Sequence, residues 1–426
     1  MRILISAGEA SGEMYGAQLI EAMRRIDPSL EFFGVGGEKM RAAGCEIVVD
    51  SKDLAVVGIT EILSHLPKIW GLFHKLIAEA DRKPDLAIVI DSPAFNWRVA
   101  RQMKKRGIPV VYYVCPQFWA WRQGRVRLLR KYVDQALVIF PFEEKFYRDR
   151  GVNAEFVGHP LADLARPSVS QEEYAAQHRL NPAKLWITLM PGSRVKEVRM
   201  NLPAMLEASR LLGAEYEFLL PVAPTLDAEF MQTLVGRASF GKGTASSRAD
   251  VRSKLTDGTT ESPALPDSNG CVFSPSGNRS DLPVVHLVPE ALPALAHSRA
   301  GIIASGTATV EAALMDLPFV MVYRVTPLTY LLGRSTVKVP HFAMVNLIAG
   351  EKIVPELVQN DFIPQNVAAE IKKIIPDGEP RRRMLAGLDQ VRLRLKGADQ
   401  ASWRPADRAA KAILVLWQRS NAAQAE

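Results

Sequence analysis

The fold can be inferred from the stretch Ile302-Ile303-Ala304-Ser305-Gly306-Thr307-Ala308-Thr309-Val310-Glu311. It predicts the end of a buried strand, a turn of small residues, and the first turn of a helix. Small side chains at Ser305, Gly306 and Thr307 leave backbone N–H groups open to a ligand, and a helix N-terminus favours phosphate. Glu311, on the helix, could accept hydrogen bonds from ribose hydroxyls. Taken alone, the stretch is more typical of an ordinary strand-to-helix turn with a Ser or Thr N-cap.

The composition is that of a globular chain with room for two or three domains. It has 426 residues, of which 48% are hydrophobic. The net charge of +7 suits acidic partners, whether nucleotide phosphates, nucleic acid or an anionic membrane surface. Cys45, Cys115 and Cys271 lie far apart and form no CxxC pair, which argues for a reducing cytoplasm. We find neither a signal peptide nor an apolar run of about 20 residues, so any membrane contact is expected to be peripheral.

The N-terminus begins like a nucleotide-binding α/β domain. Residues 2–7 predict a strand, and a loop containing Gly8, Glu9, Ser11 and Gly12 leads into an amphipathic helix. The loop lacks the GxGxxG pattern, so the dinucleotide fingerprint is absent. A charged side chain such as Glu9 has no packing role in a plain strand-to-helix turn. We therefore count this loop as a candidate ligand contact.

Residues 85–90 are the clearest buried parallel strand, and Asp91 follows them directly. Pro93 ends the strand at once. Ligands of open α/β sheets lie beyond the carboxyl ends of strands, which is where Asp91 is expected. The residue is a candidate general base, although an Asp in this place could also cap the next helix.

Two stretches combine aromatic rings with cations. Residues 58–80 form an amphipathic region with a broad apolar face and a break at Pro67, and residues 118–131 hold two Trp, one Phe and five cations. A core helix and a solvated basic face are the commoner explanations. The alternatives are a membrane or lipid-headgroup contact and, for the second stretch, base stacking on nucleic acid.

The strand-and-turn pattern restarts in the second half of the chain. A predicted strand leads into a small turn of Gly192, Ser193 and Arg194, and helices and strands then alternate as in the first half. This repetition predicts an α/β fold with two Rossmann-like domains facing each other across a cleft. Residues 237–281 are rich in Ser, Gly, Thr, Asp and Pro, and we expect a flexible surface insertion there.

Together these features suit a nucleotide-sugar glycosyltransferase. Such an enzyme must stabilise a leaving diphosphate and remove a proton from an acceptor hydroxyl. Arg194 could neutralise the diphosphate, the small-residue turn could bind it, and Asp91 could act as the base from the other domain. A base across the sugar from the leaving group would invert the anomeric centre. We find no DxD motif, so no metal is expected and cationic side chains would take its place.

Seven motifs, in order along nearly the whole chain except residues 237–281, resemble the lipid-A-disaccharide synthase family. They are SAGEASGE (6–13) with Gly16-Ala17, DSPAFN (91–96), WAWR (119–122), VGHP (157–160), PGSR (191–194), ASGTA (304–308) through Glu311, and NLIAG (346–350). Each motif is weak by itself, but their order makes chance agreement improbable.

The resemblance implies an inverting GT-B glycosyltransferase without a cofactor. The family joins UDP-2,3-diacylglucosamine to 2,3-diacylglucosamine 1-phosphate, releasing UDP and forming a β-1,6 disaccharide. It works as a peripheral protein on the cytoplasmic face of the inner membrane, with no nucleic acid partner. The implied domains are residues 1–170 on the acceptor side, 171–365 on the UDP-sugar side, and 366–426 packing back on the first domain. In a homodimer, this last segment is exchanged between subunits.

The resemblance also assigns roles to individual residues. Asp91 matches the family's essential aspartate, Arg194 its arginine important for activity, and Glu311 its nucleotide-side glutamate. The family usually has a second acidic residue where this chain has Ala94, so that group cannot be required here; Glu13 stands where Asp is usual. The implied UDP-sugar contacts are Gly192, Ser193, Arg194, Ser305, Gly306, Thr307, Glu311, Arg324 and Asn346.

If the substrates carry acyl chains that stay in the bilayer, the aromatic and basic stretches are candidates for membrane docking. Rings can lie at a membrane interface while Lys and Arg meet anionic headgroups. The candidates for membrane or acyl-chain contact are Trp70, Phe73, Phe118, Trp119, Trp121 and Arg122. The alternatives that remain are a MurG-like transferase, a UDP-GlcNAc 2-epimerase-like enzyme, and a nucleic-acid-binding protein that uses the Trp/Arg stretch.

Overall fold

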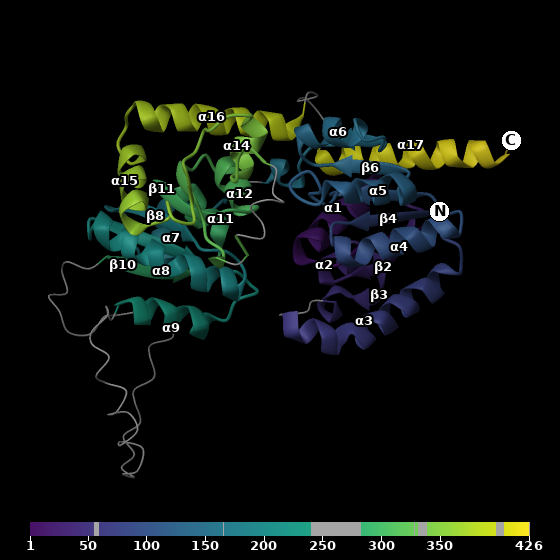
Figure 1. The fold of residues 1–426 in the computed structure, drawn as a ribbon, viewed down its shortest axis with the longest axis horizontal. Coiled ribbons are helices and arrows are strands. Elements are labelled where there is room, and N and C mark those ends of the chain that lie inside the picture. Colours follow the sequence, from purple (N-terminus) through teal and green to yellow (C-terminus); the bar gives the residue numbers. More distant parts are fainter. Residues whose placement is uncertain are drawn as a thin grey trace, which may run out of the picture. The chain divides into compact units, whose positions relative to one another are not determined.

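The computed structural model describes residues 1–54, 59–164, 166–239, 283–327, 329–330, 339–397 and 404–425. Within these residues the chain forms two compact units (Figure 1). The first comprises Met1–Leu164 and, from the C-terminus, Arg392–Glu426. The second comprises Ala165–Leu331 and Pro340–Val391. Each unit is built on one parallel sheet with helices, so the predicted α/β class with two Rossmann-like domains is confirmed.

The first unit contains a seven-stranded parallel sheet with the order β3-β2-β1-β4-β5-β6-β7. Its strands are β1 (Arg2–Ala7), β2 (Glu31–Gly36), β3 (Cys45–Asp50), β4 (Leu86–Ile90), β5 (Val110–Tyr113), β6 (Gln135–Val138) and β7 (Ala154–Phe156). Its helices are α1 (Ala10–Ile26), α2 (Glu38–Ala42), α3 (Ile59–Ala80), α4 (Pro93–Lys105), α5 (Val126–Tyr132), α6 (Pro141–Arg148) and α17 (Pro405–Ala425). Short 3₁₀ turns occupy Ser51–Asp53, Gln123–Arg125 and Pro160–Asp163.

The core of the first unit fixes β4 in place. Every residue from Leu86 to Ile90 is fully buried, because helices such as α3 and α4 pack their apolar side chains on the sheet. Burying each Leu, Ile or Val side chain of this strand contributes about 1.5–3 kcal/mol, so the residue that follows β4 has a well-defined position. One local prediction is wrong: α3 continues through Pro67 rather than breaking there.

The second unit contains a six-stranded parallel sheet with the order β10-β9-β8-β11-β12-β13. Its strands are β8 (Leu185–Met190), β9 (Tyr216–Pro221), β10 (Val284–Val288), β11 (Ala300–Ala304), β12 (Phe319–Tyr323) and β13 (Glu356–Val358). Its helices are α7 (Gln171–His178), α8 (Val195–Leu212), α9 (Ala228–Ser239), α11 (Ala291–His297), α12 (Ala308–Leu314), α14 (Met344–Ala349), α15 (Pro364–Ile374) and most of α16 (Glu379–Lys396).

The C-terminal part of the chain is divided between the two units. α15 packs on α8, so residues 366–391 remain with the second unit, and the chain joins the first unit only from Arg392. There α17 packs on α1, and Figure 1 draws it in yellow beside that helix. The segment that packs on the N-terminal domain is therefore shorter than the 366–426 expected from the family.

Both sheets reverse their strand order at one place. In the first sheet the reversal lies between β1 and β4, and in the second it lies between β8 and β11. Ligands of open α/β sheets bind beyond the carboxyl ends of the strands at such switch points. The loops that leave these four strands are therefore the first places to look for a site. The predicted insertion covers residues 237–281. Its first three residues belong to the end of α9, and residues 240–281 lie outside the described residues.

Candidate active site

Asp91 lies at the switch point of the first sheet, in a strained turn between β4 and α4. Asp91 and Ser92 both have left-handed backbones, with φ of 46° and 45°. Non-glycine residues in this region cost about 1–3 kcal/mol each, and they persist only where their surroundings hold them. The turn therefore needs strong local support.

Buried hydrogen bonds supply this support. The Asn96 side chain is fully buried, and its Nδ2 donates to the carbonyls of Ile90 at 2.8 Å and Asp91 at 2.9 Å. The Tyr112 hydroxyl donates to the same Asp91 carbonyl at 2.7 Å. The Ser6 hydroxyl donates to Asn96 Oδ1 at 2.7 Å, which fixes the orientation of the amide. The Asp91 backbone is thus held from β1, α4 and β5, and none of these three side chains binds its carboxylate.

The loop after β1 lies against this turn. A Cβ atom on Gly8 would lie 2.6 Å from Ser92 Oγ, and one on Gly12 would lie 3.7 Å from the Ile90 carbonyl oxygen. Gly8 is therefore needed for the close approach of the two loops. Glu9, the residue before α1, and Ser11, in the first turn of α1, are exposed beside it, so the helix begins earlier than the sequence predicted. The structure brings this predicted loop and Asp91 together in one place.

The environment of Asp91 suits a base that works near neutral pH. Burial and, to a smaller extent, the negative charge of Glu9 together raise the pKa of its carboxyl to about 6. A hydrogen bond from the Ser92 backbone N–H opposes this shift. A carboxylate with such a pKa is ionised at pH 7 yet accepts a proton more readily than an ordinary Asp.

Half of the predicted membrane contacts are core residues. Phe73, Phe118 and Trp119 are only 5%, 8% and 7% exposed, so these side chains offer no surface to a membrane, while the predicted acyl-chain contact stays a prediction for them. Trp119 Nε1 donates to the buried carboxyl of Glu143 at 2.8 Å, and burial raises the pKa of that carboxyl to about 7. Base stacking on Trp119 is excluded by the same burial.

The other half of these candidates face solvent. Trp70 and Trp121 are 57% and 46% exposed, and the Arg122 guanidinium lies over the Trp121 ring at 4.5 Å from its centroid. For these three residues, membrane contact stays a prediction.

Two loops meet at the switch point of the second sheet. β11 pairs with β8 so that Ile303 lies opposite Met190, which makes residues 191–194 and 305–307 neighbouring turns. The Arg194 side chain is 74% exposed and its Nη1 lies 2.9 Å from Glu197 Oε1. Glu197 Oε2 also accepts the Ser193 backbone N–H at 3.2 Å. Glu197, which was not predicted as a site residue, therefore shapes this turn.

Gly192 and Gly306 allow these two turns to form. Gly192 has φ of +122°, and a Cβ there would lie 2.6 Å from Glu197 Oε2. Gly306 has φ of +149° and faces open space, so a ligand can approach its backbone. Ser305 Oγ donates to the Phe342 carbonyl at 2.9 Å, while Thr307 makes no capping hydrogen bond with its side chain at the start of α12. Burial raises the pKa of the Glu311 carboxyl nearby on α12.

Asn346, a predicted UDP-sugar contact, is a structural residue. It is fully buried, its Oδ1 accepts the backbone N–H groups of Ile353 and Val354, and its Nδ2 donates to the Val354 carbonyl and to Glu356 Oε1. Its capacity for hydrogen bonds is thus used inside the protein. Glu356 also accepts the backbone N–H groups at the start of α14, a role that its sequence context does not reveal.

Arg324 is also engaged within the second unit. Its guanidinium donates to the Phe362 carbonyl and lies over the Phe362 ring at 4.7 Å from the centroid. This contact directs the side chain towards the segment after β13. Arg324 is accordingly a weaker candidate for the nucleotide site than Arg194.

The VGHP motif anchors the C-terminal segment on the first unit. Gly158 has φ of +89°, and a Cβ there would lie 2.5 Å from Arg408 Nη2. The His159 backbone N–H donates to the Leu395 carbonyl at 3.0 Å. Burial lowers the pKa of the His159 imidazole to about 3, and its Nδ1 accepts the Leu161 N–H at 3.1 Å, so the ring is neutral. The motif is structural.

Comparisons with known proteins identify relatives of this chain along nearly its whole length. A family model described as lipid-A-disaccharide synthetase matches residues 3–240 and 274–404. A lipid-A-disaccharide synthase of Koribacter versatilis is 48% identical over 423 residues, which is 99% of this chain and 100% of the relative. One of Acidobacterium capsulatum is 47% identical over 394 residues, 92% of this chain and 91% of the relative. The solved structure of the calicheamicin glycosyltransferase has the same fold, with a TM-score of 0.55, 16% identity and 98% of each chain covered.

Proposed function

The chain belongs to the lipid-A-disaccharide synthase family, and on this premise we propose which substrates it joins and which residues carry the reaction. It is a hexosyltransferase of lipid A disaccharide synthesis with the GT-B fold. Its donor is UDP-2,3-diacylglucosamine and its acceptor is 2,3-diacylglucosamine 1-phosphate. The products are the β-1,6-linked disaccharide 1-phosphate and UDP.

Asp91 is the general base in this proposal. Its carboxylate takes the proton of the acceptor hydroxyl as that oxygen attacks the anomeric carbon of the donor. The bond between this carbon and the diphosphate oxygen breaks, its electron pair leaves with UDP, and the anomeric configuration inverts. The observation that carries the proposal is the strained turn that presents the Asp91 carboxylate beside the Gly8 loop, with a pKa of about 6.

The two turns of the second unit receive UDP. Arg194 stabilises the charge that develops on the diphosphate, since a guanidinium can donate two parallel hydrogen bonds to phosphate oxygens. The open backbone at Gly306 contacts the same group. Glu311 accepts hydrogen bonds from the ribose hydroxyls. Gly192, Ser193, Ser305 and Thr307 shape this surface, whereas Asn346 supports the fold behind it.

The protein is proposed to work as a peripheral protein on the cytoplasmic face of the inner membrane, where its acylated substrates reside. No helix among the described residues has the length and apolar character needed to cross a bilayer. The exposed rings of Trp70 and Trp121, with Arg122, would meet the lipid surface. Co-sedimentation with phosphatidylglycerol-containing vesicles should fall in a Trp70→Ala, Trp121→Ala double variant. Undiminished binding would exclude this surface, and Leu211→Ala in the second unit is the matched control.

A homodimer is proposed on the family's precedent. Exchange of residues 392–425 between subunits would use the same contacts that α17 makes with α1 within one chain. Light scattering coupled to gel filtration measures the mass directly, and a mass of one chain at all concentrations would exclude the dimer.

The alternatives from the sequence have lost their support. The family model and the relatives favour lipid A disaccharide synthesis over a MurG-like or UDP-GlcNAc 2-epimerase-like activity. A nucleic-acid-binding role would use the Trp/Arg stretch of residues 118–131, and of its two Trp rings Trp119 is buried and cannot stack on a base.

Direct product analysis tests the function. The protein is incubated with UDP-2,3-diacylglucosamine and 2,3-diacylglucosamine 1-phosphate, and UDP and the disaccharide are measured by mass spectrometry. We expect equal amounts of the two products in the wild type and a loss of both in Asp91→Asn. Release of UDP without disaccharide, or with UDP-GlcNAc as the only donor accepted, would contradict the proposal.

A further inference from the structure

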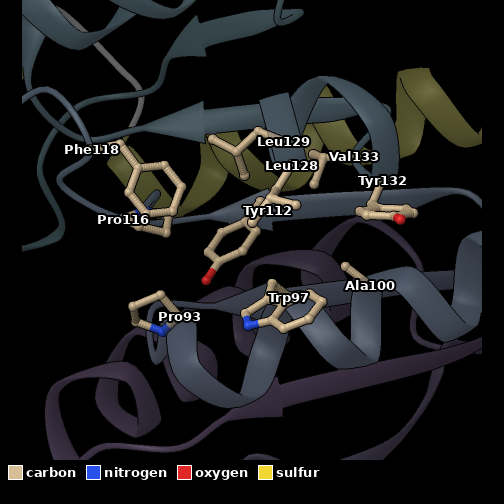
Figure 2. A pocket seen from close by; sticks show the side chains of 10 residues that line it. All are labelled: Pro93, Trp97, Ala100, Tyr112, Pro116, Phe118, Leu128, Leu129, Tyr132 and Val133. Atoms are coloured by element: carbon tan, nitrogen blue, oxygen red, sulfur yellow. The ribbon is translucent and has the colours of Figure 1, made fainter. Parts of the chain in front are cut away.

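An apolar pocket lies next to the Asp91 turn in the first unit. It is formed between α4, β5 and α5, and Figure 2 shows the Trp97 and Tyr112 rings facing the Leu128 side chain across it. Its lining side chains are apolar apart from the hydroxyl groups of Tyr112 and Tyr132 and the indole N–H of Trp97. The space between the lining atoms, including the open mouth, is about 280 Å³.

The pocket shares two residues with the support of the base. Tyr112 lines it, and the hydroxyl of the same side chain donates to the Asp91 carbonyl at 2.7 Å. Pro93, the first residue of α4 and two residues after Asp91, also lines it. The apolar surface therefore begins where the proposed base is held. A group bound there would touch the residues that position Asp91.

Two cations flank the apolar lining. The Arg98 guanidinium lies over the Trp97 ring at 4.8 Å from its centroid, and Lys131 Nζ lies over the Tyr132 ring at 5.5 Å. Both cations are exposed, while the rings below them are half-buried. An apolar interior with a cationic rim complements an anion that carries a hydrocarbon chain.

We propose that this pocket binds one acyl chain of the acceptor, 2,3-diacylglucosamine 1-phosphate. The inference rests on the proposed function, since that function supplies an acylated, anionic substrate to Asp91. The lining side chains leave little free space between them, so the chain must move the Trp97 and Tyr132 rings on entry. Both rings are half-buried, and Tyr132 also packs against the core of the first unit.

Acceptor chain length tests this site. The wild type is assayed with acceptors whose acyl chains have 4, 8 or 14 carbons, at saturating donor. Each methylene that enters the pocket should raise kcat/KM about fourfold until the pocket is full. Leu128→Trp places a larger ring among the lining residues, and we expect it to lower kcat/KM at least about tenfold for the 14-carbon acceptor and less than about twofold for the 4-carbon one. Leu211→Trp, on the exposed face of α8, is the matched control.

The outcomes separate this inference from the function itself. Equal losses on short and long acceptors, or a wild type that is indifferent to chain length, would overturn the pocket while leaving the transferase intact. A wild type that forms no disaccharide from any acceptor would overturn the proposed function instead. If Leu128→Trp does not fold, Leu128→Ala removes apolar contact without adding volume. It should lower only the long-chain kcat/KM, by about tenfold, and an unchanged long-chain value would refute the site.

Discussion

Replacing Asp91 by Asn should change activity and stability in opposite directions. Its carboxyl has an ordinary pKa of 3.8 and a pKa of about 6 in the folded protein, because it is buried and lies near Glu9. This difference of about 2 units means that ionisation costs the folded state about 3 kcal/mol at pH 7. An amide carries no charge, so Asp91→Asn should be more stable than the wild type at pH 7, by up to about 3 kcal/mol. Its turnover should fall about 10²–10⁴-fold, because the general base is lost.

The sign of the pH dependence provides a second check. A carboxyl whose pKa is raised on folding binds more protons in the folded state between about pH 4 and pH 6. The stability of the wild type should therefore fall as pH rises through this window, while that of Asp91→Asn should fall less. Below about pH 4 both states are protonated and the two proteins should be equally stable as far as this site is concerned.

Urea unfolding at pH 4, 5, 6 and 7, followed by circular dichroism, measures this difference. Only the transition of the first unit should move, since Asp91 lies there. Asp149→Asn is the matched control: Asp149 is exposed on the same unit and paired with Lys145, and its loss should change stability by less than about 0.5 kcal/mol. An Asp91→Asn variant that is less stable at pH 7 would refute the argument, since the carboxylate would then be holding the turn. Unimpaired turnover would refute its role as the base.

Three further predictions concern single residues in the two units. Arg194→Ala should weaken UDP binding about tenfold or more by calorimetry, and Arg194→Lys should restore it only in part; an unchanged affinity would exclude the diphosphate role. Asn346→Leu should destabilise the second unit by about 2–5 kcal/mol in urea, because Glu356 and nearby backbone groups lose their partners, while folded protein keeps its UDP affinity. A stable Asn346→Leu variant that cannot bind UDP would show that Asn346 contacts UDP, as the sequence predicted. Gly8→Ala should reduce turnover about tenfold with unchanged UDP binding, because its Cβ would lie 2.6 Å from Ser92 Oγ; normal turnover would show that the two loops separate without cost.

The features predicted well from sequence are those set by local patterns. A continuous apolar run such as residues 86–90 can be satisfied only by burial on both faces of a parallel sheet, which is what β4 shows. The residue after such a run must lie at the sheet edge. The order of motifs along the chain therefore places Asp91 and the Gly192 turn at strand ends, and strand order then brings each next to a second loop.

The features missed depend on partners that are distant in sequence. Trp119 and Trp121 lie two residues apart, yet one is buried and the other exposed, because Glu143 on α6 accepts the indole N–H of Trp119. A composition of rings and cations cannot show which ring turns inward. Asn346 looked like a ligand contact because it is a polar residue in a motif, and only the position of Glu356 shows that its amide is fully occupied.

The left-handed turn at Asp91 could not be predicted for a different reason. Neither Asp91 nor Ser92 is a glycine, so no local preference indicates a positive φ at both. The conformation is imposed by Asn96 and Tyr112, which reach it from α4 and β5. Such imposed strain is typical of functional sites.

The way in which the C-terminal segment completes the first unit has a consequence for synthesis on the ribosome. Gly158 contacts Arg408, His159 donates a hydrogen bond to Leu395, and α1 packs on α17. These contacts can form only after residues 165–391 have been translated. At about 5–20 residues per second this delay is roughly 10–45 seconds. During that time the nascent first unit exposes the apolar face of α1 that α17 will cover. We expect a ribosome-associated chaperone to occupy this face, and late nonsense mutations to send the whole protein to proteolysis although both candidate sites have already been made.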